Sequence, residues 1–150
     1  MAKFIVTKIA KPAPWLIETA ASIGLDYSAL THEITDHFVN HVLNRHGNPA
    51  THGAATVTEA DFAMIPSIVK SPDLAIVGAD RDGLCNVYVK IENDMTWLYF
   101  DNVLDSKRNR VLRGATLYKV TRPLTLAEIL HNVAGNGKTD VSKAKVLERA

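Results

Sequence analysis

Four histidines within one fifteen-residue stretch form the densest group of side chains that could do chemistry: His32, His37, His41 and His46. On a helix, His37 and His41 share one face, where two imidazoles can hold a single metal ion. The zinc-protease pattern His-Glu-x-x-His does not fit, because His32 and His37 are one residue too far apart. No third ligand is evident, so we expect no metal site and no cofactor. The alternative is that these histidines are buried with hydrogen-bond partners or exposed.

His46 fits acid–base chemistry better than the other histidines. It follows Arg45 and precedes Gly47, where a helix is expected to end. A helix C-terminus favours the protonated imidazole and the neighbouring arginine opposes it, so this histidine could titrate near neutral pH. A general acid or base needs such a pKa. A histidine that only caps the helix is the structural alternative.

Two of the predicted strands carry polar side chains that alternate with apolar ones. Lys90 shares a strand face with Asn86 and Tyr88, and Thr116 shares one with Tyr118. A lysine directed toward a covered face is unusual, although its stem can reach the edge of a sheet. These residue types are also common on ordinary exposed sheets.

The formal net charge of +1 conceals an uneven distribution, because residues 101–150 hold ten basic and five acidic side chains. The basic residues gather in one stretch, at Lys107, Arg108, Arg110, Arg113, Lys119 and Arg122. Such a stripe can attract phosphates even in a chain that is nearly neutral. It could equally protect the edge of a sheet from association.

Length and composition exclude several classes of protein. A chain of 150 residues with 47% hydrophobic residues is expected to fold as one domain rather than to be disordered. No apolar stretch approaches the roughly 18 residues of a membrane span, and the N-terminus does not resemble a signal peptide. Cys85 is the only cysteine, so no disulfide framework is possible. We expect a soluble protein of a reducing compartment, with no membrane association.

The first half of the sequence predicts helices after one short strand over Lys3–Ile9. Helical spacing of apolar residues predicts a helix over Trp15–Ile23, and a second from Asp26 or Ser28 to about His46. Thr58 begins a capping-box pattern with Asp61, followed by a short helix over 62–69.

The second half has the alternation and turn residues of an antiparallel sheet. The predicted strands are 74–77, 84–91, 96–103 and 111–120, and a last helix over 126–133 starts after Thr125. We therefore expect an α+β fold in which N-terminal helices pack on a four-stranded antiparallel sheet, with a C-terminal helix. Residues 1–135 would form the domain, and 136–150 a polar tail.

Four strings, in this order, resemble the phage-associated branch of the Barnase–EndoU–colicin–RelE-like nucleases from about Gly24 to about Lys119. The helix end 41–47 is similar to the family's His-x-x-x-x-His-Gly, and the closing strand 112–119 to its Thr-x-Tyr-Lys core. The other two strings are 58–73 and the strand 87–90. The sequence departs from the family in the connection before Thr58, in the region 97–101 and in the helix after Pro123.

The resemblance implies a nuclease site on the open face of the sheet and a reaction without metal. In such enzymes a base activates the ribose 2′-hydroxyl, which attacks the adjacent phosphate, and an acid protonates the leaving 5′-oxygen. It implies His46 as acid or base with His41 as its partner, Lys90 and Thr116 as donors to the phosphate, and RNA as the substrate. The expected substrate-binding residues are Arg45, Arg113, Tyr118 and Lys119.

A second class of function remains open: a module of the same fold that binds nucleic acid or a protein without cutting. Domains of this family occur attached to phage head and toxin proteins, so an immunity protein or a phage structural protein is a partner to consider, and tRNA is an RNA to consider. Metal-dependent hydrolysis by His37 and His41 is a third. The expected location is the cytoplasm of a bacterial or phage-infected cell.

Overall fold

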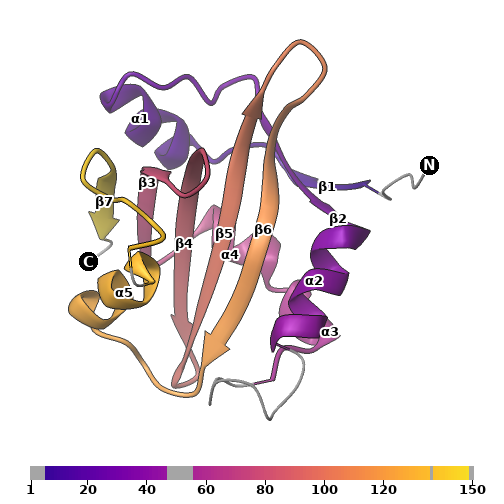
Figure 1. The fold of residues 1–150 in the computed structure, drawn as a ribbon, viewed down its shortest axis with the longest axis vertical. Coiled ribbons are helices and arrows are strands. Elements are labelled where there is room, and N and C mark those ends of the chain that lie inside the picture. The colour runs from indigo at the N-terminus through magenta and orange to yellow at the C-terminus, as the bar shows by residue number, and fades with distance from the viewer. Residues whose placement is uncertain (1–5, 47–55, 136, 149–150) are drawn as a thin grey trace.

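The computed structural model describes residues 6–46, 56–135 and 137–148, which form one seven-stranded sheet with helices on both faces (Figure 1). The strand order is β1-β2-β6-β5-β4-β3-β7. The strands are β1 (Val6–Ala10), β2 (Thr31–Thr35), β3 (Leu74–Asp80), β4 (Leu84–Glu92), β5 (Met95–Asp105), β6 (Arg110–Val120) and β7 (Lys145–Glu148). The helices are α1 (Pro14–Ser22), α2 (Asp36–His46), α3 (Glu59–Phe62), α4 (Ile65–Lys70) and α5 (Leu126–Ala134). The α+β class is confirmed, whereas the prediction of a four-stranded sheet was wrong.

Three strands account for the difference, and β2 is the most instructive. The long helix expected from Asp26 or Ser28 starts only at Asp36, because residues 31–35 form a strand. Asp26 instead accepts hydrogen bonds from the amide and hydroxyl of Ser28 in a local turn. β2 pairs antiparallel with β1 and parallel with β6, and both partners are distant in sequence. Long-range pairing therefore overrides the helical spacing of the apolar residues in this segment.

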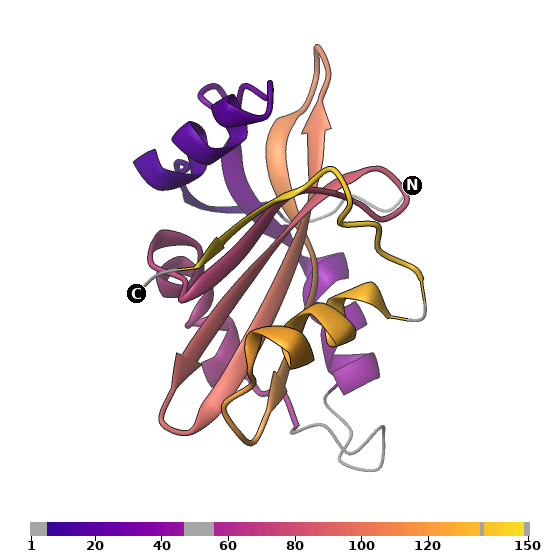
Figure 2. The same cartoon turned by 90° about the vertical axis from the view of Figure 1, so that its left-hand side faces the viewer.

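The segment expected to be a polar tail contributes the third extra strand. β7 pairs antiparallel with β3, and Figure 2 shows how the chain runs from the end of α5 to this edge of the sheet. Locally encoded features agree with the sequence. Thr125 caps α5 by accepting a hydrogen bond from the Glu128 amide, and Asp61 accepts one from the Thr58 amide at the start of α3.

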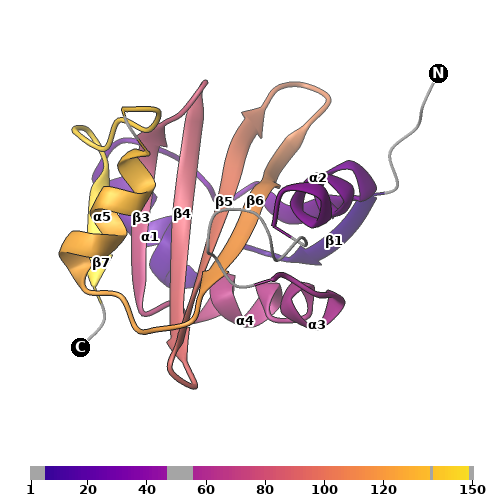
Figure 3. The same ribbon diagram turned by 60° about the horizontal axis from the view of Figure 1, so that its bottom comes forward.

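The two faces of the central sheet are covered differently. The packed face, which carries Trp97 and Tyr99 of β5, lies under α1 and α4 and joins the larger apolar core. The groove face, which carries Leu98 and Phe100, packs against α5 through Ile129 and Val133. α5 lies over β3 and β4, while α2 lies beside β6 (Figures 1 and 3), so this face of β5 and β6 is flanked by two helices.

A β-bulge interrupts β6 in the middle of its pairing with β5. Phe100 pairs with Thr116 and Asp101 pairs with Gly114, which leaves Ala115 as the extra residue. Gly114 lies in a tight packing site, where a Cβ atom would be 2.8 Å from the Tyr99 hydroxyl and 3.2 Å from a ring carbon of Phe38. Only glycine fits this position without displacing the neighbouring rings.

Candidate nucleic-acid site on the groove face

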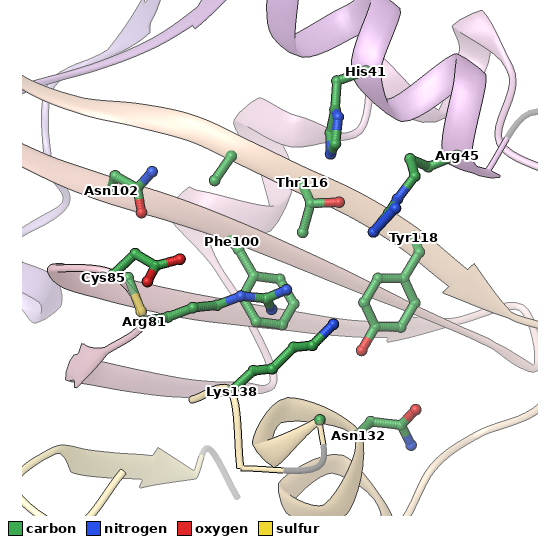
Figure 4. Close-up of a pocket in the computed structure, with 13 residues that line it drawn as sticks. His41, Arg45, Arg81, Cys85, Phe100, Asn102, Thr116, Tyr118, Asn132 and Lys138 are labelled. Carbon is green, nitrogen blue, oxygen red and sulfur yellow. The ribbon is translucent and has the colours of Figure 1, made fainter. Parts of the chain in front are cut away.

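A cavity of about 400 Å³ opens on the groove face between α2 and α5. Its floor is formed by β5 and β6, and its walls carry side chains from α2, from the β3–β4 turn and from the segment after α5 (Figure 4). The cavity brings together four of the eight residues that the sequence singled out: His41, Arg45, Thr116 and Tyr118.

His41 and Arg45 come from adjacent turns of α2, four residues apart, and both point toward the cavity (Figure 4). The helix can present them there because Phe38 and Val42, on its other side, are buried in the main core. Partial burial lowers the pKa of His41, and the charges of Arg45 and His37 lower it further. A lowered pKa favours the neutral imidazole, the form that can accept a proton.

Thr116 and Tyr118 lie on β6 opposite Phe100 and Leu98 of β5, so their side chains share the groove face. The Tyr118 ring stacks on Phe100, with ring centroids 6.0 Å apart. Burial raises the pKa of Tyr118 to about 12, so its hydroxyl keeps its proton at neutral pH and remains a hydrogen-bond donor.

Arg81 and Lys138 are the cationic residues that sequence reasoning missed. The guanidinium carbon of Arg81 lies 5.3 Å from the centre of the Phe100 ring, in a cation–π arrangement. Lys138 follows α5 and reaches toward the middle of the cavity (Figure 4). Arg81 belongs to a turn that the sequence predicts, whereas Lys138 lies in the segment expected to be a polar tail, and nothing in the sequence directs either residue to β5 and β6.

The charge at the cavity is positive. Arg45, Arg81 and Lys138 line it together with one carboxylate, Asp82, among the described residues. None of these three cations forms an ion pair within the described part of the chain. Donors that are not neutralised inside the protein remain available to an anionic ligand.

Lys90 and Lys119 lie on the packed face, away from this cavity, because each shares a register position with Trp97 on the neighbouring strand. The Lys90 ammonium donates to the carbonyl of Ser71 at 2.8 Å. The Lys119 ammonium lies 2.9 Å from a carboxylate oxygen of Asp61. The expectation that these lysines meet Thr116 over one surface is corrected: strand alternation directs them to the opposite side of the sheet.

The structure describes the side chain of one of the two remaining predicted residues, Arg113, but not that of the other, His46. Arg113 is on the groove face but lines an adjoining hollow, where its Nε donates to buried Glu33 at 2.8 Å. α2 ends at His46, and the side chain of His46 lies outside the part of the structure that is described. Its assignment as acid or base therefore stays a prediction from the sequence.

The described residues contain no cluster of three or more histidine, cysteine, aspartate or glutamate side chains arranged to hold a metal ion. Their helices include none with the length and apolar character that crossing a bilayer requires.

Comparison with known protein families gives a match over most of the chain. The model of one family, described as phage-Barnase-EndoU-ColicinE5/D-RelE like nuclease 3, matches residues 10–125. No curated protein and no solved structure gives a significant match to the chain. The match covers α1 to the start of α5, including every strand that forms the floor of the cavity. This chain belongs to the phage Barnase–EndoU–colicin E5/D–RelE-like nuclease 3 family.

Proposed function

We propose that the chain is a metal-independent endoribonuclease whose active site is the cavity between α2 and α5. One observation carries the proposal: His41, whose pKa is lowered, lines the same cavity as three cations that form no ion pair with a carboxylate among the described residues. A base and a set of phosphate-binding donors are what cleavage of RNA by its own 2′-hydroxyl requires.

In the proposed reaction, His41 accepts the proton of the ribose 2′-hydroxyl as this oxygen attacks the adjacent phosphorus. A bond forms between the 2′-oxygen and phosphorus, and the bond between phosphorus and the 5′-oxygen breaks. An acid donates a proton to the departing 5′-oxygen, a role that we propose for His46. The products are a 2′,3′-cyclic phosphate and a 5′-hydroxyl end.

The other lining residues would stabilise the charge that develops on the phosphate. Arg45 and Lys138 approach the cavity from opposite walls, so that a phosphate between them would contact both. The Thr116 hydroxyl would donate a hydrogen bond to a non-bridging oxygen. Preorganised donors of this kind stabilise a transition state more than the ground state when they face the oxygens that gain charge. Tyr118 and Arg81 would contact the base that adjoins the phosphate.

The test is cleavage of transfer RNA, ribosomal RNA and short oligonucleotides in the presence of EDTA, with detection of cyclic phosphate ends. His41→Ala is expected to lower kcat/KM by about a hundredfold or more, the contribution of a positioned acid or base. His131→Ala is the matched control, because His131 is exposed on α5 and does not line the cavity. His46→Ala tests the second histidine in the same assay.

Two outcomes would contradict the proposal. Absence of cleavage by the native chain over the whole panel would leave a binding module of the same fold, particularly if salt-sensitive RNA binding survives in His41→Ala. Cleavage that is equally fast in His41→Ala and in the native chain would place the chemistry elsewhere in the molecule.

A further inference from the structure

A second hollow, of about 410 Å³, adjoins the proposed active-site cavity on the groove face. The two share three lining residues, His41, Asn102 and Ala115, so they form one continuous depression. Beyond this shared boundary, the second hollow is lined by His37 at the start of α2, Leu104 of β5 and Arg113 of β6.

The bulge in β6 creates this arrangement. Arg113 and Thr116 are three residues apart, and on a regular strand they would point to opposite faces. The extra residue Ala115 shifts the pairing, so that Arg113 lies opposite Asn102 and Thr116 lies opposite Phe100. Asn102 and Phe100 are two residues apart on β5 and share the groove face, so the bulge brings Arg113 to the same side as Thr116.

Glu33 holds Arg113 in a fixed orientation through one nitrogen of its guanidinium, Nε. Its Nε donates to Glu33, a carboxylate whose side chain is only 4% exposed, while the Arg113 side chain is 31% exposed. Among the described residues, the terminal nitrogens of Arg113 donate to no other group. A planar fork with two free amino groups is suited to a phosphate or to the edge of a base.

The remaining residues supply the chemistry that recognises one nucleotide. The exposed amide of Asn102 offers both a donor and an acceptor to the edge of an unpaired base. The imidazole of His37 offers a ring face, and Leu104 offers apolar surface. A base within a duplex is paired along its Watson–Crick edge and stacked on both faces, so it offers neither that edge to Asn102 nor a face to His37.

We infer that the second hollow is a subsite for the nucleotide next to the scissile phosphate, and that the substrate is a single RNA strand lying along both hollows. This inference rests on the proposed function for the position of the cut, but the binding that it requires does not depend on catalysis. Recognition through unpaired bases is the usual mode for RNA-binding sites of this kind.

Binding is tested with a fluorescent single-stranded oligonucleotide that carries 2′-deoxyriboses, since it cannot undergo 2′-hydroxyl attack. Arg113→Ala and Asn102→Ala are each expected to weaken its binding by about tenfold, the effect of losing one good hydrogen-bonded contact. Arg110→Ala is the matched control, because Arg110 lies exposed on the same strand and lines neither hollow. A duplex of the same sequence is expected to bind at least tenfold more weakly than the single strand.

Arg113→Ala leaves Glu33 without its partner and can unfold the protein, whereas Asn102 makes no side-chain hydrogen bond among the described residues and its variant keeps the fold. Equal binding by the native chain, Asn102→Ala and Arg110→Ala would overturn the inference, as would preference for the duplex. If the native chain binds the strand through Asn102 but cleaves no RNA, the subsite stands and the proposed function fails. If RNA is cleaved and Asn102→Ala changes neither binding nor kcat/KM, the subsite fails alone.

Discussion

The packed face of the sheet and the cavity on the groove face use cationic side chains in opposite ways. On the packed face, the Lys119 ammonium is held by Asp61, and Lys90 by a backbone carbonyl. On the groove face, Arg45, Arg81 and Lys138 converge without an ion pair among the described residues. Lysine occurs in both places, so residue type alone does not decide the role. What separates a structural cation from a candidate ligand-binding one is the face to which it points and whether the fold supplies an anion there.

The largest expected effect concerns stability and sharpens this contrast. Lys119→Met removes the partner of a buried carboxylate, Asp61, and is expected to lower the free energy of unfolding by about 3 kcal/mol. Lys138→Met makes the same change at an exposed residue of the groove face and is expected to change it by less than about 0.5 kcal/mol. Urea denaturation of both variants checks this. Similar losses in the two would remove the distinction between the faces.

The packed face also holds a buried pair whose titrations oppose each other. Asp101 accepts hydrogen bonds from Tyr88 and Asn86, and burial raises its pKa to about 7. His32 lies 3.9 Å from the same carboxylate, and burial lowers its pKa to about 4. Between pH 4 and 6.5, Asp101 is protonated in the folded state but ionised in the unfolded state. His32 is neutral in the folded state but protonated in the unfolded state. The Asp101 contribution to stability therefore falls as pH rises, and the His32 contribution rises.

Single substitutions at Asp101 and His32 test how each residue makes the free energy of unfolding depend on pH. Relative to the native chain, Asp101→Asn is expected to gain stability as pH rises from 4 to 6.5, by about 3 kcal/mol in all. His32→Phe is expected to lose stability over the same interval. Urea denaturation at pH 4.5, 5.5 and 6.5 gives both slopes. Variants that follow the native chain at every pH would show that neither group titrates as its burial requires.

On the groove face the expected loss is in activity rather than stability. If the chain cleaves RNA as proposed, Lys138→Met and Arg81→Met are each expected to lower kcat/KM by about tenfold, since each would remove one charge-assisted contact to the substrate. Lys107→Met, at an exposed position in the β5–β6 turn, is the control for the loss of a positive charge. A loss as large in the control would indicate general attraction of RNA rather than a contact in the cavity.

The smallest effect is a shift in pH dependence. The charge of Arg45 is one of the causes that lower the pKa of His41, so Arg45→Gln is expected to raise that pKa. If neutral His41 is the base, the acidic limb of the kcat/KM profile moves to higher pH in this variant. NMR titration of His41 in the free protein measures the same shift directly. A limb that stays in place while the His41 pKa rises would assign the limb to another group.

Local signals predicted the capped helices, the turns and the alternation of the four central strands, because each depends on residues close in sequence. Alternation also placed Lys90 with Asn86 and Tyr88, which is correct. It could not tell which face would be covered, since that depends on where α1, α4 and α5 pack. The strand β2 could not be predicted, because it depends on pairing with β1 and β6, which are distant in sequence. Arg81 and Lys138 were not recognised, because only the packing of their segments brings them to the cavity. The site is assembled from segments that only the tertiary fold brings together.

The bulge at Ala115 interrupts the alternation of side chains along β6, so that odd-numbered residues before it and even-numbered residues after it face the same side of the sheet. Deleting Ala115 would restore a regular strand and keep Arg113 and Thr116 on the same side, whereas a strand of unchanged length without the bulge would turn Arg113 toward the packed face. Ala115 contributes no functional group of its own, yet its place in the bulge keeps Arg113 and Thr116 on one side of the sheet.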